Sequence, residues 1–214
     1  MTCTISVLIA GLLLIAAIIP ATASVRTFDF TFLGAAYSED PNGAVAVGVI
    51  TFEDTYLLNP GRNDFDLTTL EGLAAVQSLN VTVTGAAGGL GDGDFTRADF
   101  THVIFDTSLI GLDLFSKLVG QDTSSLSGNK WGEIEIIPGS NPPQSYTGDF
   151  EIIAAAGSSA PSGFWPFQIG AANANGDGMR LTSFAIVPEP AAWLLAAISL
   201  GVFGLVRKIG NFNN

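Results

Sequence analysis

The amino-acid sequence predicts an all-β fold, an antiparallel jelly-roll-like β-sandwich, between a signal helix and a short C-terminal transmembrane helix. Two observations support this prediction. Apolar and polar residues alternate with a period of two in many short segments, as they do in strands that bury one face. Turn-forming runs such as Asp40-Pro41-Asn42-Gly43 and Asn59-Pro60-Gly61 separate these segments. Many short strands punctuated by turns are typical of an antiparallel sandwich.

The N-terminal residues 1–23 have the features of a secretory signal peptide. Their apolar run, 5–19, contains no charged residue, and Pro20 ends it. Ala21 and Ala23 then supply the small side chains that precede a cleavage site. We therefore expect this segment to direct export and to be removed.

We expect cleavage between Ala23 and Ser24, so that residues 24–186 form the exported domain. Cys3, the only cysteine, would be lost with the signal peptide. The mature chain could then form no disulfide, thiolate zinc site or iron–sulfur cluster. Residues 2–4 contain no Lys or Arg. An uncleaved N-terminal membrane anchor is therefore the alternative interpretation.

The exported domain contains eight predicted strands in which apolar residues recur at alternate positions. The predicted strands are 25–33, 44–52, 76–84, 99–106, 130–137, 146–154, 164–169 and 179–187. The clearest inward-facing residues are Phe28, Phe30, Phe32, Leu79, Val81 and Val83. Between the strands, residues 67–76 predict a short helix. Residues 109–119 are compatible with either a strand or a helix.

The predicted strand 99–106 carries the only histidine of the chain. His102 is expected on the same face as Phe100 and Ile104, since alternate residues of a strand share a face. A lone histidine in apolar surroundings is more often packed or hydrogen-bonded than catalytic. It cannot build a histidine-based metal site alone.

The exported domain is strongly acidic. The whole chain has 20 Asp and Glu against 8 Lys and Arg, a net charge of −12, and nearly all of the acidic residues lie between Ser24 and Val187. A nucleic-acid partner is not expected, because phosphate contacts need clustered basic residues. The sequence contains no G-x-S-x-G elbow, P-loop or dinucleotide fingerprint. We therefore predict neither an enzymatic activity nor a cofactor.

Two acidic or amide-rich runs resemble parts of calcium sites. Asp92, Asp94 and Asp99 offer the hard oxygen ligands that Ca²⁺ prefers, but their spacing does not match an EF-hand loop. Residues 173–178 match the first half of such a loop, although its twelfth position is Phe184 instead of Glu. A solvated loop and a hairpin turn, respectively, are the preferred interpretations.

Aromatic and acidic residues in the second half of the domain raise the possibility of a sugar ligand. Trp131, Trp165 and Phe164 could form a stacking platform for sugar rings, although core burial of such residues is preferred. Glu133 and Glu135 share one face of a predicted strand whose sequence, KWGEIEII, resembles the catalytic strand of laminarinase-type glycosidases. Those enzymes need a further carboxylate along the strand, where this chain has proline and glycine. A carbohydrate-binding module is thus one alternative function, and a β-glycan hydrolase is a less favoured one.

The C-terminus has three parts in a fixed order. Val187-Pro188-Glu189-Pro190 comes first, a 16-residue apolar run at 191–206 follows, and Arg207-Lys208 closes the segment. As a helix the apolar run would span roughly 24 Å. This length is short for a bilayer core but tolerable when the flanking basic pair snorkels. Arg207 and Lys208 are expected to remain cytoplasmic, which leaves the exported domain in the periplasm.

This order of motif, apolar helix and basic end resembles the PEP-CTERM sorting signal of Gram-negative bacteria. The resemblance covers residues 187–208, and the tail that completes 187–214 is slightly longer than is usual in that family. It implies recognition near Pro188-Glu189-Pro190 by an exosortase, a membrane cysteine transpeptidase. It also implies an inner-membrane precursor whose domain then moves to the cell surface or the exopolysaccharide matrix. A simple C-terminal membrane anchor is the alternative.

The middle of the chain is similar to a class of uncharacterised PEP-CTERM ectodomains. The similarity lies in GVITFED at 48–54, DFTHVIFDT at 99–107 and RLTSFAIVPEP at 180–190. That class implies no settled activity. The sequence therefore predicts an exported surface or matrix protein whose domain has a structural or binding role.

Overall fold

The computed structural model describes residues 24–36, 42–87, 91–107, 111–122, 130–133, 149–162, 167–169 and 178–188. The predicted signal peptide, the apolar run at 191–206 and the basic pair Arg207-Lys208 lie outside these residues. Within the described part of the chain, no helix is long and apolar enough to span a bilayer.

The described residues form ten strands and few helical turns. The strands are β1 Val25–Leu33, β2 Val45–Glu53, β3 Arg62–Asp66, β4 Val76–Thr84, β5 Gly93–Thr96, β6 Phe100–Asp106, β7 Phe150–Ala154, β8 Pro161–Ser162, β9 Phe167–Ile169 and β10 Gly178–Ile186. The helical elements are α2 Leu70–Ala75 and the 3₁₀ turns η1 Gly34–Ala36, η2 Asp54–Tyr56 and η4 Arg97–Asp99.

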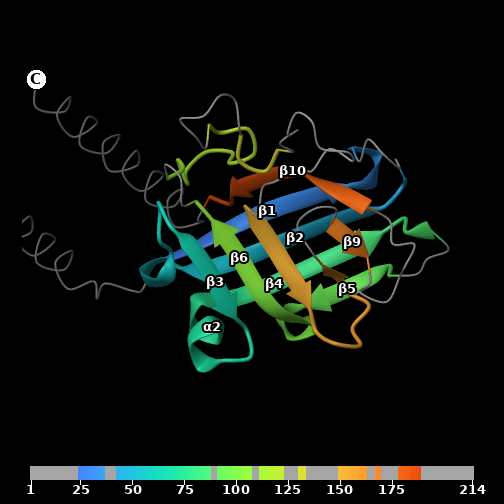
Figure 1. Ribbon diagram of the computed structural model, residues 1–214, viewed down its shortest axis with the longest axis horizontal. Helices are drawn as coiled ribbons and strands as arrows, with labels where there is room; N and C mark the ends of the chain where they lie inside the picture. Colours follow the sequence, from blue (N-terminus) through green and yellow to red (C-terminus); the bar gives the residue numbers. More distant parts are fainter. Residues whose placement is uncertain are drawn as a thin grey trace, which may run out of the picture.

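The strands make two sheets that lie face to face. The large sheet has the order β5-β4-β2-β1-β10-β9-β8, and the small sheet has the order β3-β6-β7. Every pairing between the described strands is antiparallel. In Figure 1 the strands of the small sheet cross those of the large sheet. The predicted all-β antiparallel class is confirmed, whereas the jelly-roll arrangement is not.

Phenylalanine rings fill the space between the two sheets. Phe28 and Phe30 of β1 are fully buried, as the alternation in the sequence predicted. The ring of Phe28 lies 6.1 Å from that of Phe105 in the small sheet, and the ring of Phe30 lies 5.1 Å from that of Phe150. Phe184 of β10 contacts rings from both sheets. Aromatic side chains from the two sheets therefore contact one another directly between the layers.

Gly48 of β2 makes room for one of these rings. Gly48 is paired in register with Phe30 of β1, whose ring lies over the glycine. A Cβ atom at Gly48 would overlap with that ring. The absence of a side chain at this inward position is thus a packing requirement of the core.

Both ends of the described chain leave the domain at the same place. β1 and β10 are antiparallel neighbours, with Phe28 opposite Ile186, so that the start of β1 lies beside the end of β10 (Figure 1). The Val187 amide still donates to the Thr27 carbonyl at 2.7 Å. The Ser24 carbonyl accepts from the amide of Asp54 in η2 at 2.9 Å. We call this part of the domain the exit end.

Several predicted elements differ from the structure. The strand expected at 130–137 is not formed over 130–133, where Lys130 makes one isolated bridge and a turn follows. The reason is Trp131, which is fully buried against Phe105 and Phe184, so the chain must turn to insert the indole into the core. The ambiguous segment 109–119 is neither strand nor helix over its described residues.

Two smaller differences concern the boundary of a helix and the face on which one residue lies. The helix expected at 67–76 is the shorter α2, which begins after Thr69, whose hydroxyl accepts from the Gly72 amide. In β6, the register with β7 shifts between Phe100 and His102, so the regular alternation of side chains between the two faces is broken there. Phe100 therefore joins the core cluster instead of sharing the face of His102 and Ile104.

Candidate functional site

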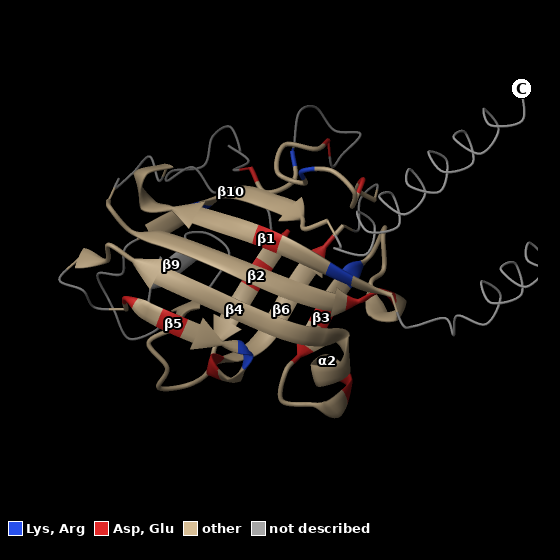
Figure 2. Cartoon of the chain, turned by 180° about the vertical axis from the view of Figure 1, so that it is seen from behind, with Lys and Arg blue, Asp and Glu red and all other residues tan. Residues whose placement is uncertain are grey.

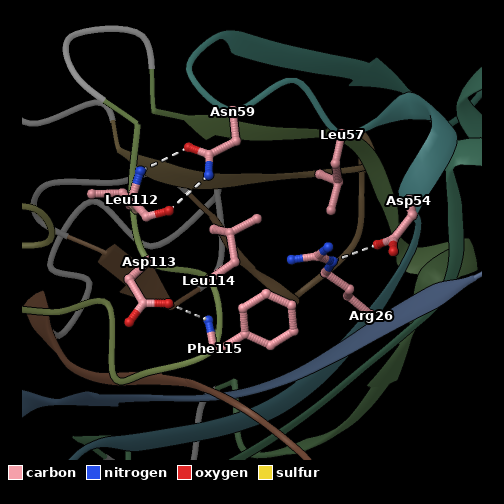
Figure 3. Close-up of a pocket in the computed structure, with 8 residues that line it drawn as sticks. All are labelled: Arg26, Asp54, Leu57, Asn59, Leu112, Asp113, Leu114 and Phe115. Carbon is pink, nitrogen blue, oxygen red and sulfur yellow. Dashed lines mark hydrogen bonds and ion pairs between the residues drawn. The ribbon is translucent and has the colours of Figure 1, made fainter.

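A pocket at the exit end is the best-defined candidate site in the described residues. Its volume is about 440 Å³. Four separate segments supply its walls: the start of β1, η2 with the residues after it, the loop that contains Asn59, and the loop 111–122. The lining residues are Arg26, Asp54, Leu57, Asn59, Leu112, Asp113, Leu114 and Phe115 (Figure 3). We call it the exit pocket.

A stacked ion pair forms one wall of the exit pocket. Arg26 Nε donates to Asp54 Oδ1 at 2.6 Å, and the two side chains are only 24% and 22% exposed. The guanidinium also lies over the ring of Phe115, with its central carbon 4.8 Å from the ring centroid. Arg26 is held by the Asp54 carboxylate and in turn supports an aromatic ring that is 74% exposed.

Asn59 fixes the opposite wall of the exit pocket. Its Oδ1 accepts from the Leu112 amide and its Nδ2 donates to the Leu112 carbonyl, both at 2.7 Å (Figure 3). Further along the same loop, Asp113 Oδ1 accepts from the Phe115 amide at 3.0 Å. These bonds tie the loop to the domain and set the position of Phe115.

Gln121 closes the loop 111–122 on itself. Its Oε1 accepts from the Asp113 amide, and its Nε2 donates to the carbonyls of Asp113 and Lys117 and to the hydroxyl of Ser116. The Leu118 amide donates to the carbonyl of Phe184 in β10 at 2.8 Å. The exposed ring of Phe115 is therefore presented by a loop with a dense set of hydrogen bonds.

The carboxylates of the exit pocket are engaged in contacts within the protein. Asp54 is ion-paired, and Asp113 accepts a backbone hydrogen bond, so both carboxylates have structural partners. None of the described lining residues is a Ser, Cys, His or Lys that these carboxylates could activate. The exposed ring of Phe115 lies beside these polar groups.

A second hollow lies beside α2 and contains a buried acid. Glu53 is 6% exposed, and its carboxylate accepts from Gln77 Nε2 at 3.0 Å and from the Thr55 hydroxyl at 3.4 Å. Arg97 lines the same hollow, but its guanidinium donates to backbone carbonyls at the end of α2, including that of Leu73 at 3.1 Å. The charged groups of Glu53 and Arg97 are therefore both engaged in hydrogen bonds within the domain.

The structure does not gather the three carboxylates that were considered as weak calcium ligands into one site. Asp92 accepts from the Ala86 amide at 2.9 Å and Asp94 accepts from the Thr82 hydroxyl at 2.6 Å. Asp99 Oδ2 accepts from the amide of Thr96, as part of the capping box of η4. In the part of the chain that the structure describes, no group of three His, Cys, Asp or Glu side chains could hold a metal ion. The possible turn at 173–178 lies outside the described residues, except for Gly178.

Of the three aromatic residues considered as a sugar-stacking platform, the structure describes only Trp131. Trp131 is fully buried, and its Nε1 donates to the Asp106 carbonyl at 2.9 Å, so the indole has no face for a sugar ring. Core burial, the preferred interpretation, applies to this residue. Trp165 and Phe164 lie outside the described residues. Glu133 lies in a bend instead of a strand, and Glu135 is not described.

His102 is partly buried on β6, opposite Asp66 of β3 in the register of the small sheet. The hydrogen bonds that Asp66 accepts from the side chain and backbone of Thr68 lower the pKa of the Asp66 carboxyl, and the charge of His102 contributes slightly. These two residues face each other across the edge strand β3 and the central strand β6 of the small sheet, and neither lines the exit pocket.

Sequence reasoning did not identify the residues of the exit pocket. Arg26 lies in a predicted strand, as Lys130 and Arg180 do, and Asn59 lies in a predicted turn. Phe115 fell in the segment that was ambiguous between strand and helix. The basic side chain near the start of the predicted strand 25–33 is the only sequence signal for this site, and it is not distinctive, because two other predicted strands also contain a basic residue.

Comparison with known proteins does not assign the chain to a family. It matches no family model, no curated protein and no solved structure.

Proposed function

We propose that this protein is exported and processed at the membrane through its C-terminal PEP-CTERM-like signal, and that its β-domain has a structural or binding role at the cell surface or in the extracellular matrix. The observation that carries this proposal is the direct continuation of β10 into the Val187-Pro188-Glu189-Pro190 motif. Val187 is still hydrogen-bonded to Thr27 at the end of the sheet. The first residue of the motif is therefore held at the end of the sheet.

The exposure of the first two residues of the motif supports access by a processing enzyme. Val187 and Pro188 are both exposed, whereas Phe184, just upstream, is fully buried. Proline has no amide hydrogen and restricts the preceding residue to extended conformations. The two prolines that flank Glu189 therefore favour an extended, accessible segment, which is the form in which proteolytic enzymes commonly bind a chain.

The acidic surface fits an exported matrix protein and argues against nucleic acid as the partner. Acidic residues outnumber basic ones in the view of Figure 2, in agreement with the net charge of −12. A negative surface would repel phosphates and keep the domain soluble outside the cell. The proposed partners are thus an exosortase-type enzyme, the membrane during transit, and the exopolysaccharide matrix at the destination.

Processing in two matched Gram-negative hosts, one with and one without an exosortase, tests this function. We expect the full chain to lose its C-terminal segment only in the host with the enzyme. Replacement of Pro188, Glu189 and Pro190 by alanine should leave the segment in place in both hosts. Equal processing of the two variants in both hosts would contradict the proposal.

Carbohydrate binding is the second candidate function, and the exit pocket favours it. The ring of Phe115 is exposed beside polar side chains, an arrangement that suits stacking against a sugar. The jelly-roll arrangement predicted from the sequence would also fit, since lectin domains use it. Affinity gels with bacterial exopolysaccharides should then retard the wild type more than Phe115→Ala. Equal migration in gels with and without glycan would exclude this function.

A further inference from the structure

Large apolar side chains are exposed around the exit end. Tyr56, Leu58, Leu73 and Phe115 are 37%, 59%, 36% and 74% exposed, and we call these four residues the exit rim. Tyr56 lines one hollow with Leu73 and a second with Leu58. Phe115 is linked to η2, which contains Tyr56, through the stacked ion pair of Arg26.

The other exposed large apolar residues make the contrast between the two ends clear. Among the described residues these are Leu70 of α2, Val187 at the chain exit, and Val47 and Val49 on the outer face of β2. Leu70 and Val187 are also at the exit end. Val47 lies toward the opposite end, because it is paired with Thr82 near the end of β4, so the exposed leucine and aromatic side chains of the described residues lie at the exit end and the two exposed valines of β2 do not.

The length of the C-terminal connection limits how far the exit end can lie from a membrane. Four residues, Val187 to Pro190, separate the last sheet hydrogen bond from the apolar run at 191–206. Fully extended, they span at most about 14 Å. The headgroup region of one leaflet is itself roughly 5–8 Å thick. With the apolar run inserted, the exit end must therefore lie at or just above the headgroups.

The N-terminal connection adds a second restraint before signal cleavage. Four residues, 20–23, join the apolar run 5–19 to Ser24, whose carbonyl is bonded to η2. The two connections start from neighbouring strands, about 4.8 Å apart. Both therefore draw the same end of the domain toward the bilayer.

We infer that the exit rim docks on the phospholipid surface while the precursor is held in the membrane. Tyr and Phe favour the boundary between headgroups and acyl chains, and the leucines add apolar area there. The docked rim would hold the Pro188-Glu189-Pro190 segment beside the bilayer, where a membrane-embedded enzyme acts. This inference rests on the proposed membrane transit, but it adds a lipid contact that the sorting signal itself does not require.

Site-specific quenching in the full chain tests the docking. The protein, with Cys3→Ser, receives a single cysteine at Lys117, an exposed position two residues from Phe115 that leaves the rim intact. The matched control carries the cysteine at the exposed Thr84, at the other end of β4 and about 26 Å from its start. Both are labelled with the same fluorophore and reconstituted into vesicles of phosphatidylethanolamine and phosphatidylglycerol. The vesicles include a lipid with a nitroxide quencher near the top of one acyl chain.

We expect the protein to float with the vesicles and the probe at position 117 to be quenched several-fold more strongly than the probe at 84. Adding Phe115→Ser and Leu58→Ser should reduce the quenching at 117 without releasing the protein from the vesicles. Flotation with equal, weak quenching at both positions would overturn the docking and leave membrane insertion standing. Failure to float would overturn the proposed membrane transit and the docking together.

Discussion

The aromatic core and the exit end are built from the same residue types but in opposite ways. In the core, rings such as Phe28, Phe105 and Phe184 are fully buried and contact one another across the two sheets. At the exit end, the ring of Phe115 is 74% exposed and lies on an arginine. The core contacts hold the fold together, whereas the exposed ring adds little burial. This difference separates residues that stabilise the domain from residues that are available to a partner.

Removal of a core ring should have the largest effect on stability. Phe184 lies 4.8 Å from the ring of Phe150 and 5.2 Å from that of Trp131. Phe184→Ala should lower the free energy of unfolding by about 3–5 kcal/mol, because it leaves a cavity between the sheets. Urea denaturation of the exported domain followed by tryptophan fluorescence measures the change. Phe184→Leu, which fills more of the space, should cost clearly less, and equal losses for the two variants would argue against tight ring packing.

An added methyl group in the core should have the next largest effect. Gly48→Ala should destabilise the domain by about 1–3 kcal/mol, because the new Cβ atom overlaps with the ring of Phe30. Gly43→Ala is the matched control, since a Cβ atom there meets its nearest neighbour, a backbone oxygen of Gly85, at 3.5 Å. Thermal unfolding of both variants should show a drop only for Gly48→Ala. Similar midpoint temperatures for the two variants would mean that the ring of Phe30 can shift to make room for the added methyl group.

Loss of the Asn59 side chain should weaken the exit end by a moderate amount. Asn59→Ala removes both hydrogen bonds to the Leu112 backbone and should cost about 1–3 kcal/mol. Asn59→Asp keeps an acceptor for the Leu112 amide but loses the donor, so it should fall between the wild type and Asn59→Ala. Hydrogen exchange of the loop amides, read by mass spectrometry, should report faster exchange at 111–122 while β1 and β2 stay protected. Equally faster exchange in the loop and in β1 and β2 would show instead that the loop and the core unfold together.

The Glu151 carboxyl in β7 of the small sheet should make the stability of the domain depend weakly on pH. Burial raises the pKa of the Glu151 carboxyl above its ordinary value of 4.5, and the nearby Arg62 partly opposes this shift. The folded protein therefore takes up a proton at higher pH than the unfolded chain. Stability from this group should increase as the pH falls from above the raised pKa toward 4.5.

Glu151→Gln removes the charge that the folded state disfavours. The variant should be slightly more stable than the wild type at pH 7, and its advantage should shrink as the pH approaches 4.5. Chemical denaturation of both proteins across this range provides the comparison. A stability advantage of Glu151→Gln that grows as the pH falls would contradict the raised pKa of Glu151.

Removal of the exposed ring at the exit end should have the smallest effect on stability. Phe115→Ala should change the free energy of unfolding by no more than about 0.5 kcal/mol, because the ring is largely exposed and buries little area. The same urea denaturation used for Phe184→Ala gives a direct comparison of the two rings. A loss above 2 kcal/mol, on the order of a core substitution, would place Phe115 in the stabilising core and remove it from the exit rim.

The alternating strands were the part of the fold that sequence reasoning could find. The bounds of β1 and β4 agree with the predicted segments, and Phe28, Leu79 and Val81 point inward as expected. These strands bury one whole face, so their pattern repeats every second residue. Local sequence was sufficient there because the packing requirement is the same along the whole strand.

The missed strands have compositions that hide their pairing. The sequence of β3 is RNDFD, with Phe65 as its single large apolar residue, and its strand structure depends on register with β6. The sequence of β5, GDFT, pairs with β4 through a short ladder. Charged and glycine-containing segments of this kind look like loops until a neighbouring strand provides hydrogen bonds.

The candidate site was hidden because its parts are far apart in the chain. Arg26 and Phe115 meet only after the loop 111–122 is folded against Asn59, a contact between residues 53 positions apart. The polar residues concerned are common types with no fixed spacing. The exit motif is different: Val187-Pro188-Glu189-Pro190 is contiguous, so the order of residues alone indicates it.

Mass spectrometry of the mature protein, isolated from a Gram-negative host that carries an exosortase, tests the central claim most directly. The account predicts a chain that begins at Ser24 and ends near the Pro188-Glu189-Pro190 motif, without residues 191–214. A mature protein that retains both Met1 and Asn214 would contradict the proposed export and sorting.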